Sequence, residues 1–301
     1  MKIESFPRKL FLFRNNLCMF AQTQNELHNM KHMSILAVSL LALVACTPEK
    51  KQEADYSQYV NPMIGTDFTG NTYPGAQVPF GMVQLSPDNG LPGWDRISGY
   101  FYPDTTIAGF SHTHLSGTGA GDLYDISFMP VTRPYKEAPA PLGIYSTFSH
   151  NDEAASAGYY RVLLKDYNIN VELTATERCG IQRYTFPEAE ASVFLNLKKA
   201  MNWDFTLDSK IEVVDSTTIR GYRLSQGWSP LQHVYFETRF SKPFVACHMD
   251  TTSIVTKEKG WIGTAYVARF DFNTKKDEEI LVTTGISGVS MEGAGKNLRA
   301  E

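Results

Sequence analysis

The sequence has few cysteines, only four in 301 residues. Cys18 and Cys46 fall in the N-terminal part, which is predicted not to belong to the fold, so Cys179 and Cys247 are the one candidate pair within it. A fold of this size with one possible bridge does not rest on a disulfide framework. The sequence leaves open whether the two pair or stay as buried thiols, because pairing needs a geometry that sequence does not show.

Clusters of basic residues are also absent. The chain has 28 Lys and Arg against 32 Asp and Glu. Five basic and two acidic residues fall in residues 1–45, which leaves 23 basic and 30 acidic side chains and a formal charge of −7 for the rest. With no arginine-rich strip in an acidic chain, the sequence excludes nucleic acid as a partner.

Two motifs of common enzyme classes are missing as well. No G-x-x-x-x-G-K-[ST] motif follows a predicted strand, which argues against a phosphate-binding loop. No serine occupies a G-x-S-x-G turn, so a hydrolase with a nucleophilic triad is disfavoured.

The apolar run at 34–45 is too short to span a bilayer as a helix. It follows Lys31 and ends in Leu43-Val44-Ala45-Cys46, which resembles a bacterial lipobox. Residues 30–45 are therefore predicted to be a lipoprotein signal peptide, Cys46 the lipid-modified residue and 46–56 a polar tether. Residues 1–29 are interpreted as an upstream translation artefact, and the product as exported and lipid-anchored, in the periplasm or at the cell surface.

The remaining residues show the period-2 alternation of half-buried strands. Apolar residues alternate with polar ones over 169–175 and again over 234–240. Further strands are predicted at 78–85, 126–131, 159–164, 181–186, 193–197, 210–214, 218–224, 265–272 and 279–286. Short strands separated by turns predict an all-β fold, an antiparallel β-sandwich over 57–290.

One helix is predicted, at the end of the chain. Ser290 can cap it, and 291–301 contains good helix formers. We interpret this segment as the start of a truncated linker helix.

Residues 59–124 form a segment rich in glycine, proline, aromatic residues and aspartate. Within it, Trp94 and Asp95 could recognise a sugar, because an indole stacks on the C–H face of the ring and a carboxylate accepts hydrogen bonds from its hydroxyls. The alternative, a core tryptophan beside a turn-capping aspartate, fits the sequence equally well.

His112 and His114 lie two residues apart and would share one face of a strand. Two ligands make an incomplete metal site, so hydrogen bonding to substrate or to the nearby glycine loop is favoured, and no metal site is predicted. Asp122 and Asp125 could form a carboxylate pair with Asp95 or Asp104, but turn capping is the favoured role for each.

Three ordered stretches, YVNPMIGTDFTGNTYPGAQVPFGMVQLSPD, GWDRISGY and IAGFSHTHLSGTGAGDLYDISFMP, resemble the N-terminal domain of glycoside hydrolase family 92. These are calcium-dependent exo-acting α-mannosidases common in gut Bacteroidetes, and the resemblance covers roughly residues 56–301. It implies a galactose-mutarotase-like sandwich followed by an (α/α)6 barrel, with inverting chemistry by two carboxyl groups. It also implies that the calcium and the catalytic acid and base come largely from the barrel.

The resemblance assigns no catalytic residue to this chain. It gives Trp94 and Asp95, and less directly His112 and His114, as the wall of the terminal mannose subsite. The leading hypothesis is therefore the carbohydrate-binding N-terminal domain of an α-1,2-mannosidase that lacks its catalytic domain. The alternatives are a stand-alone lipid-anchored glycan-binding module and one half of a split mannosidase.

Overall fold

The computed structural model describes residues 55–139, 142–198, 204–256 and 261–301. Residues 56–301 form one compact unit. The predicted signal peptide, Cys46 and all but the last residues of the tether lie outside the described part. Within the described ranges, no helix has the length and apolar character needed to span a bilayer.

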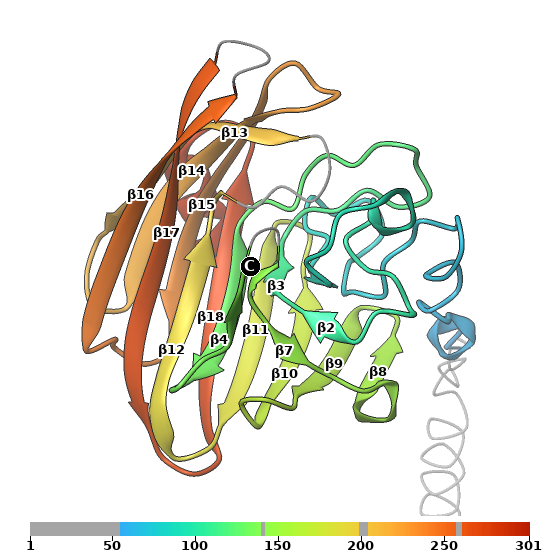
Figure 1. Cartoon of the computed structure of the whole chain (residues 1–301), viewed down its shortest axis with the longest axis horizontal. Coiled ribbons are helices and arrows are strands. Elements are labelled where there is room, and N and C mark those ends of the chain that lie inside the picture. The colour runs from blue at the N-terminus through green and yellow to red at the C-terminus, as the bar shows by residue number, and fades with distance from the viewer. Residues whose placement is uncertain (1–54, 140–141, 199–203, 257–260) are drawn as a thin grey trace, which may run out of the picture. The chain divides into compact units, whose positions relative to one another are not determined.

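Two antiparallel sheets stack face to face (Figure 1). The larger sheet has the order β13 (Phe205–Val213), β14 (Thr218–Gln226), β15 (Gln232–Phe240), β18 (Glu278–Ser287), β11 (Cys179–Phe186), β10 (Ile169–Ala175), β9 (Tyr159–Leu164) and β8 (Glu153–Ser156). The smaller has the order β1 (Ser86–Asp88), β3 (Gly109–Ser111), β4 (Ser127–Thr132), β12 (Ala189–Asn196), β17 (Trp261–Thr274) and β16 (Ala246–Thr256).

Short elements complete the unit. Two small ladders pair β2 (Thr106–Ile107) with β7 (Ser146–Thr147), and β5 (Glu137–Ala138) with β6 (Gly143–Ile144). Three single turns of 3₁₀ helix are η1 (Ser57–Tyr59), η2 (Trp94–Arg96) and η3 (His150–Asp152), and the C-terminal helix is α2 (Met291–Ala300).

The core lies between the sheets, because alternate residues of each strand point inward. Phe240 of β15 shows the contact directly: its ring lies 6.4 Å from that of Phe128 on β4 and 5.2 Å from that of Phe270 on β17, between centroids. The predicted antiparallel β-sandwich with a C-terminal helix is confirmed.

One strand prediction was wrong, and one long strand was not predicted. Residues 78–85 form a turn and an isolated bridge instead of a strand, and Phe80 has a φ of +61°. Pro79 lacks an N–H and Gly81 donates to the Val78 carbonyl at 3.0 Å, so the chain bends there. Strand β16 was not predicted, because its polar sequence, with His248 and Asp250, lacks an apolar face; it is an edge strand paired only with β17.

Helix α2 begins as predicted, with the Ser290 hydroxyl accepting from the Gly293 N–H at 3.0 Å. It lies against the outer face of the larger sheet, where a Cβ at Gly285 would approach the Ala294 carbonyl oxygen to 2.6 Å. The Asn297 amide donates to the Ile286 carbonyl at 2.8 Å. The helix is therefore packed onto the sandwich along its length.

The loop-rich segment 59–124, coloured blue to green in Figure 1, lies beside the two sheets. It is connected to them through β1 and β3, which extend the smaller sheet. The sandwich thus provides a rigid support for the segment in which the sequence placed the binding residues.

Candidate functional site

Trp94 stands at the surface on the single turn η2. Gly93 has a φ of +149°, a conformation that L side chains rarely adopt, and its carbonyl accepts from the Arg96 N–H at 3.0 Å. The turn leaves the indole of Trp94 55% exposed and Asp95 partly exposed beside it. The sequence left open whether Trp94 lies in the core or at a binding surface. Because its indole is exposed, Trp94 is not a core residue.

Arg96, the last residue of η2, holds this turn in place through its side chain. Its guanidinium donates two hydrogen bonds to the buried carboxylate of Asp104, at 2.6 and 2.5 Å, and lies 4.7 Å above the ring of Phe101. The bond to Asp104 also raises the pKa of Arg96 above its ordinary value. Asp104 is thus paired with an arginine, and not with a second carboxylate.

The loop 115–123 passes close to Trp94. A Cβ on Gly119 would lie 3.4 Å from the edge of the Trp94 ring, so the loop backbone runs at van der Waals distance from the indole. The Gly117 N–H donates to the Asn71 carbonyl at 2.6 Å, which ties the same loop to an earlier turn. Trp94 is therefore backed by the glycine loop.

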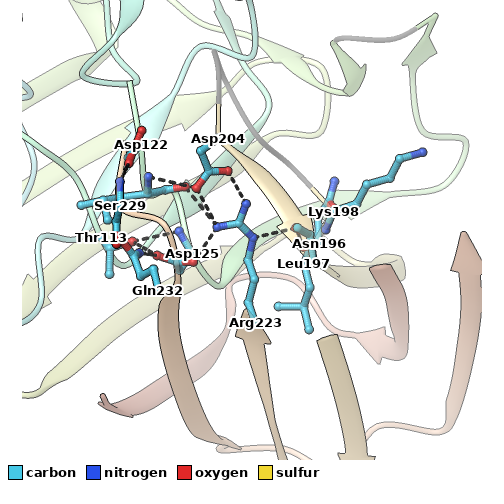
Figure 2. A network of polar contacts seen from close by, with 12 residues as sticks. Thr113, Asp122, Asp125, Asn196, Leu197, Lys198, Asp204, Arg223, Ser229 and Gln232 are labelled. Carbon is cyan, nitrogen blue, oxygen red and sulfur yellow. Dashed lines mark hydrogen bonds and ion pairs between the residues drawn. The ribbon is translucent and has the colours of Figure 1, made fainter. Parts of the chain in front are cut away.

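A buried ion cluster holds the base of this loop (Figure 2). Arg223 of β14 is fully buried and donates to Asp125 at 2.7 Å and to Asp204 at 2.5 Å. Its Nε donates to the Thr206 hydroxyl at 2.9 Å, and Nη1 also faces the Leu123 carbonyl at 3.4 Å. One cation thereby links the end of the loop to two strands of the larger sheet.

The cluster holds two carboxylates for one guanidinium. Burial opposes the charged form of Arg223, but Asp204 and Asp125 outweigh it and raise its pKa above the ordinary value. The second oxygen of Asp125 accepts from the Thr113 hydroxyl at 2.7 Å and from the Gln232 amide at 2.9 Å. Burial raises the pKa of Asp204 despite the arginine.

Asp122 also has a structural role. Its carboxylate is buried and accepts the Ser229 N–H at 3.1 Å, in the turn between β14 and β15. It therefore caps a turn, as predicted, whereas Asp125 is a member of the ion cluster. Neither carboxylate is placed to act on a substrate.

His112 is fully buried. Its Nδ1 donates to the Ile126 carbonyl at 2.7 Å, and its Nε2 has no hydrogen-bond partner among the described residues. The ring is so close to Gly180 that a Cβ there would lie 2.6 Å from it. Burial lowers the pKa of His112 to about 4.

His114 is 3% exposed and faces a different set of neighbours. Its Nδ1 lies 2.7 Å from the Gln84 carbonyl, and its Nε2 lies 2.9 Å from Asp88 and 3.1 Å from the Ser111 hydroxyl. The ring also packs under Gly99 at the end of the Trp94 turn. The two histidines do not share a strand face, because β3 ends at Ser111, and neither ring is accessible to a sugar in this arrangement.

The described residues contain no group of three or more His, Cys, Asp or Glu side chains able to hold a metal ion. Cys179 on β11 and Cys247 on β16 belong to different sheets, and both are free thiols. Burial raises the pKa of Cys179 to about 11, so this thiol is unreactive.

Arg223 and Asp204 were not predicted as site residues from the sequence. One signal for Arg223 was available: it stands four residues after the buried Ile219, in the inward phase of a predicted strand. A charged residue at such a position is almost always paired.

Known proteins resemble this chain over most of its described length. A family model described as the glycosyl hydrolase family 92 N-terminal domain matches residues 59–287. The solved family GH92 α-mannosidase of Bacteroides thetaiotaomicron in complex with mannoimidazole has 39% sequence identity and a TM-score of 0.73, over 81% of this chain and 34% of that one. A family GH92 inverting mannosidase of the same organism has 26% identity and a TM-score of 0.67, over 83% of this chain and 34% of that one.

A curated protein of Arthroderma benhamiae, described as an uncharacterized secreted glycosidase, is 26% identical over 172 residues, 54% of this chain and 21% of that protein. The chain therefore spans about a third of the solved relatives and about a fifth of the curated one. It corresponds to a part of each of these proteins.

Proposed function

The chain belongs to glycosyl hydrolase family 92, and we propose that it forms one wall of the terminal-mannose site of an inverting α-1,2-mannosidase. The observation that carries this proposal is the exposed indole of Trp94 beside Asp95, on a turn fixed by Arg96 and backed by the glycine loop. A flat apolar ring next to a carboxylate suits the C–H face and the hydroxyls of a sugar. His114 packs against Gly99, at the end of the same turn.

The acid and base of the reaction are proposed to come from an (α/α)6 domain, in the same chain or in another. Inverting hydrolysis needs one carboxylic acid to protonate the leaving oxygen and a carboxylate to activate water on the opposite face. Asp122 and Asp125 are buried and bound to protein groups, so they fit neither role. The calcium of the family is proposed to be bound by that domain as well.

An apolar hollow beside the glycine loop is evidence for contact with such a helical domain. It has a volume of about 240 Å³, and its lining includes Met82, Leu123 and Val234. Phe80 and Val289 are also largely exposed. Exposed apolar groups of this kind are typical of surfaces covered by another domain, and we assign them to the contact with the helical domain.

Export with a lipid anchor at Cys46 is proposed from the lipobox-like sequence, and the description of the Arthroderma benhamiae relative as secreted supports export. Replacing Cys46 with serine is expected to move the protein from the membrane fraction to the soluble fraction, because the acylated thiol is lost. Fractionation of cells followed by immunoblotting measures this. An unchanged membrane fraction would contradict lipid anchoring at Cys46.

Replacing Trp94 with alanine is expected to weaken binding of methyl α-mannoside by about tenfold or more, because the stacking surface is lost. NMR titration of the chain with this sugar measures the affinity. Trp94→Phe should keep part of it, and Val245→Ala, at an exposed apolar site away from the loop, should keep all of it.

The chain alone is expected to bind without hydrolysing α-mannosides, since the catalytic acid and base are proposed to come from the helical domain. Turnover at a rate comparable with that of a complete relative would show that the catalytic groups are misplaced in this proposal. Equal affinity of wild type and Trp94→Ala would exclude Trp94 from the site.

A further inference from the structure

A second tryptophan is presented on the turn that joins β14 and β15. Trp228 is 75% exposed, and its indole makes no hydrogen bond or ring contact with the part of the chain that the structure describes. The turn itself is well fixed, since the Gly227 N–H donates to the Ser229 carbonyl at 3.0 Å. An exposed indole on a rigid turn offers a flat apolar face and an N–H donor at low entropic cost.

The glycine loop connects this turn to Trp94. Asp122 of the loop accepts the Ser229 N–H at 3.1 Å, and a Cβ on Gly227 would lie only 2.4 Å from the Asp122 carboxylate. Three residues earlier, a Cβ on Gly119 would lie 3.4 Å from the Trp94 ring. Because three residues of chain span at most on the order of 10 Å, the two exposed tryptophans border one short loop.

The ion cluster holds the glycine loop and the Trp228 turn in place. Asp125, just beyond the loop, binds Arg223 of β14 and accepts the amide of Gln232 at the start of β15. The same two strands carry the Trp228 turn between them, as Figure 2 shows for Ser229, Asp122 and the cluster. The positions of the turn and of the loop are thus set by one set of buried contacts.

We propose that Trp228 stacks on a second sugar of a bound oligosaccharide, next to the residue held by Trp94. This inference rests on the proposed function and extends it from a terminal mannose to a neutral α-linked mannose chain. The part of the glycine loop next to Trp94 exposes small and polar residues, Ser116, Gly117, Thr118 and Gly119. Such a surface suits the hydroxyl rim of a sugar better than the apolar core of a protein interface.

The test compares the affinities of the full chain for methyl α-mannoside and for an α-linked mannotriose, by NMR titration. Trp228→Ala is expected to weaken triose binding by about fivefold to tenfold and to leave the monosaccharide within about twofold of wild type. Trp228→Phe should restore most of the triose affinity. Leu231→Ala, an exposed apolar residue three positions away, is the matched control and should change neither.

The possible failures are distinguishable. If wild type binds neither sugar, or Trp94→Ala binds both normally, the proposed function is wrong and this inference with it. If both sugars bind through Trp94 but Trp228→Ala leaves the triose unaffected, only the inference is overturned, and Trp228 is then assigned to a protein contact. If Trp228→Ala weakens the binding of both sugars equally, the inference is also overturned, because Trp228 would not contact a second sugar unit.

Discussion

Replacing Arg223 with methionine is expected to lower the free energy of unfolding by about 3–5 kcal/mol at pH 7. Methionine fills a similar volume but leaves the carboxylates of Asp125 and Asp204 buried without their shared cation. Two acceptors, the Thr206 hydroxyl and the Leu123 carbonyl, lose a donor as well. Urea unfolding followed by circular dichroism measures the change.

The loss should be smaller at pH 4 than at pH 7. Burial already raises the pKa of Asp204 in the intact cluster, so the folded state takes up a proton more readily than the unfolded state. Ionised Asp204 therefore lowers the free energy of unfolding once the pH rises above the ordinary pKa range of an aspartate. This loss of stability is larger when the arginine is absent. Protonation at low pH removes part of the uncompensated charge.

Arg133 provides the matched control. It is partly exposed and pairs with Asp271 at 3.0 Å on the surface, so Arg133→Met should cost less than about 1 kcal/mol. Arg223→Lys keeps the charge but cannot reach both carboxylates with a planar fork, and should lie between the two. An Arg223→Met variant no less stable than Arg133→Met would show that the cluster does not stabilise the fold.

Several of the strands that the sequence predicted correctly bury one face only. In β10, Ile169, Val171 and Leu173 are buried while Asn170 is exposed, so the alternation is visible in the sequence. The failed prediction at 78–85 had apolar residues but also Pro79, and its backbone is set by contacts to distant segments: the Met82 N–H donates to the Glu177 carbonyl at 2.6 Å. Local alternation cannot reveal such contacts.

The residues around the candidate site also differ in how far local sequence could predict them. Trp94 and Asp95 could be proposed from the sequence because they are adjacent residues whose chemistry suits a sugar. Arg223 and Asp125 are 98 positions apart in sequence, and no local pattern brings them together. Their pairing follows from the two sheets, so it could be found only once the arrangement of strands was known.

The histidines show why residue type and spacing were not enough. The period-2 argument for His112 and His114 assumed that the strand continued, but β3 ends at Ser111 and the chain turns. Each ring then enters a separate buried environment, one against Gly180 and the other beneath Gly99. Substitutions of these histidines are therefore expected to affect the stability of the fold.

The chain is expected to lose about 3 kcal/mol of stability through His112 alone as the pH falls from about 6.5 to about 4. Burial lowers the pKa of His112 from 6.5 to about 4. Between these values the unfolded state binds a proton that the folded state does not, so the contribution is fully present above pH 6.5 and is lost as the pH falls to 4. Protonation would place a second N–H at Nε2, where no described residue accepts it.

His112→Asn removes this titration, while its amide can still donate to the Ile126 carbonyl that now accepts from Nδ1. Urea unfolding between pH 4 and 7 should give a flatter curve for this variant than for wild type, whereas Val245→Ala, at an exposed site that does not titrate, should follow the wild type. Parallel curves for wild type and His112→Asn would mean that the ring is protonated equally in the folded and unfolded states.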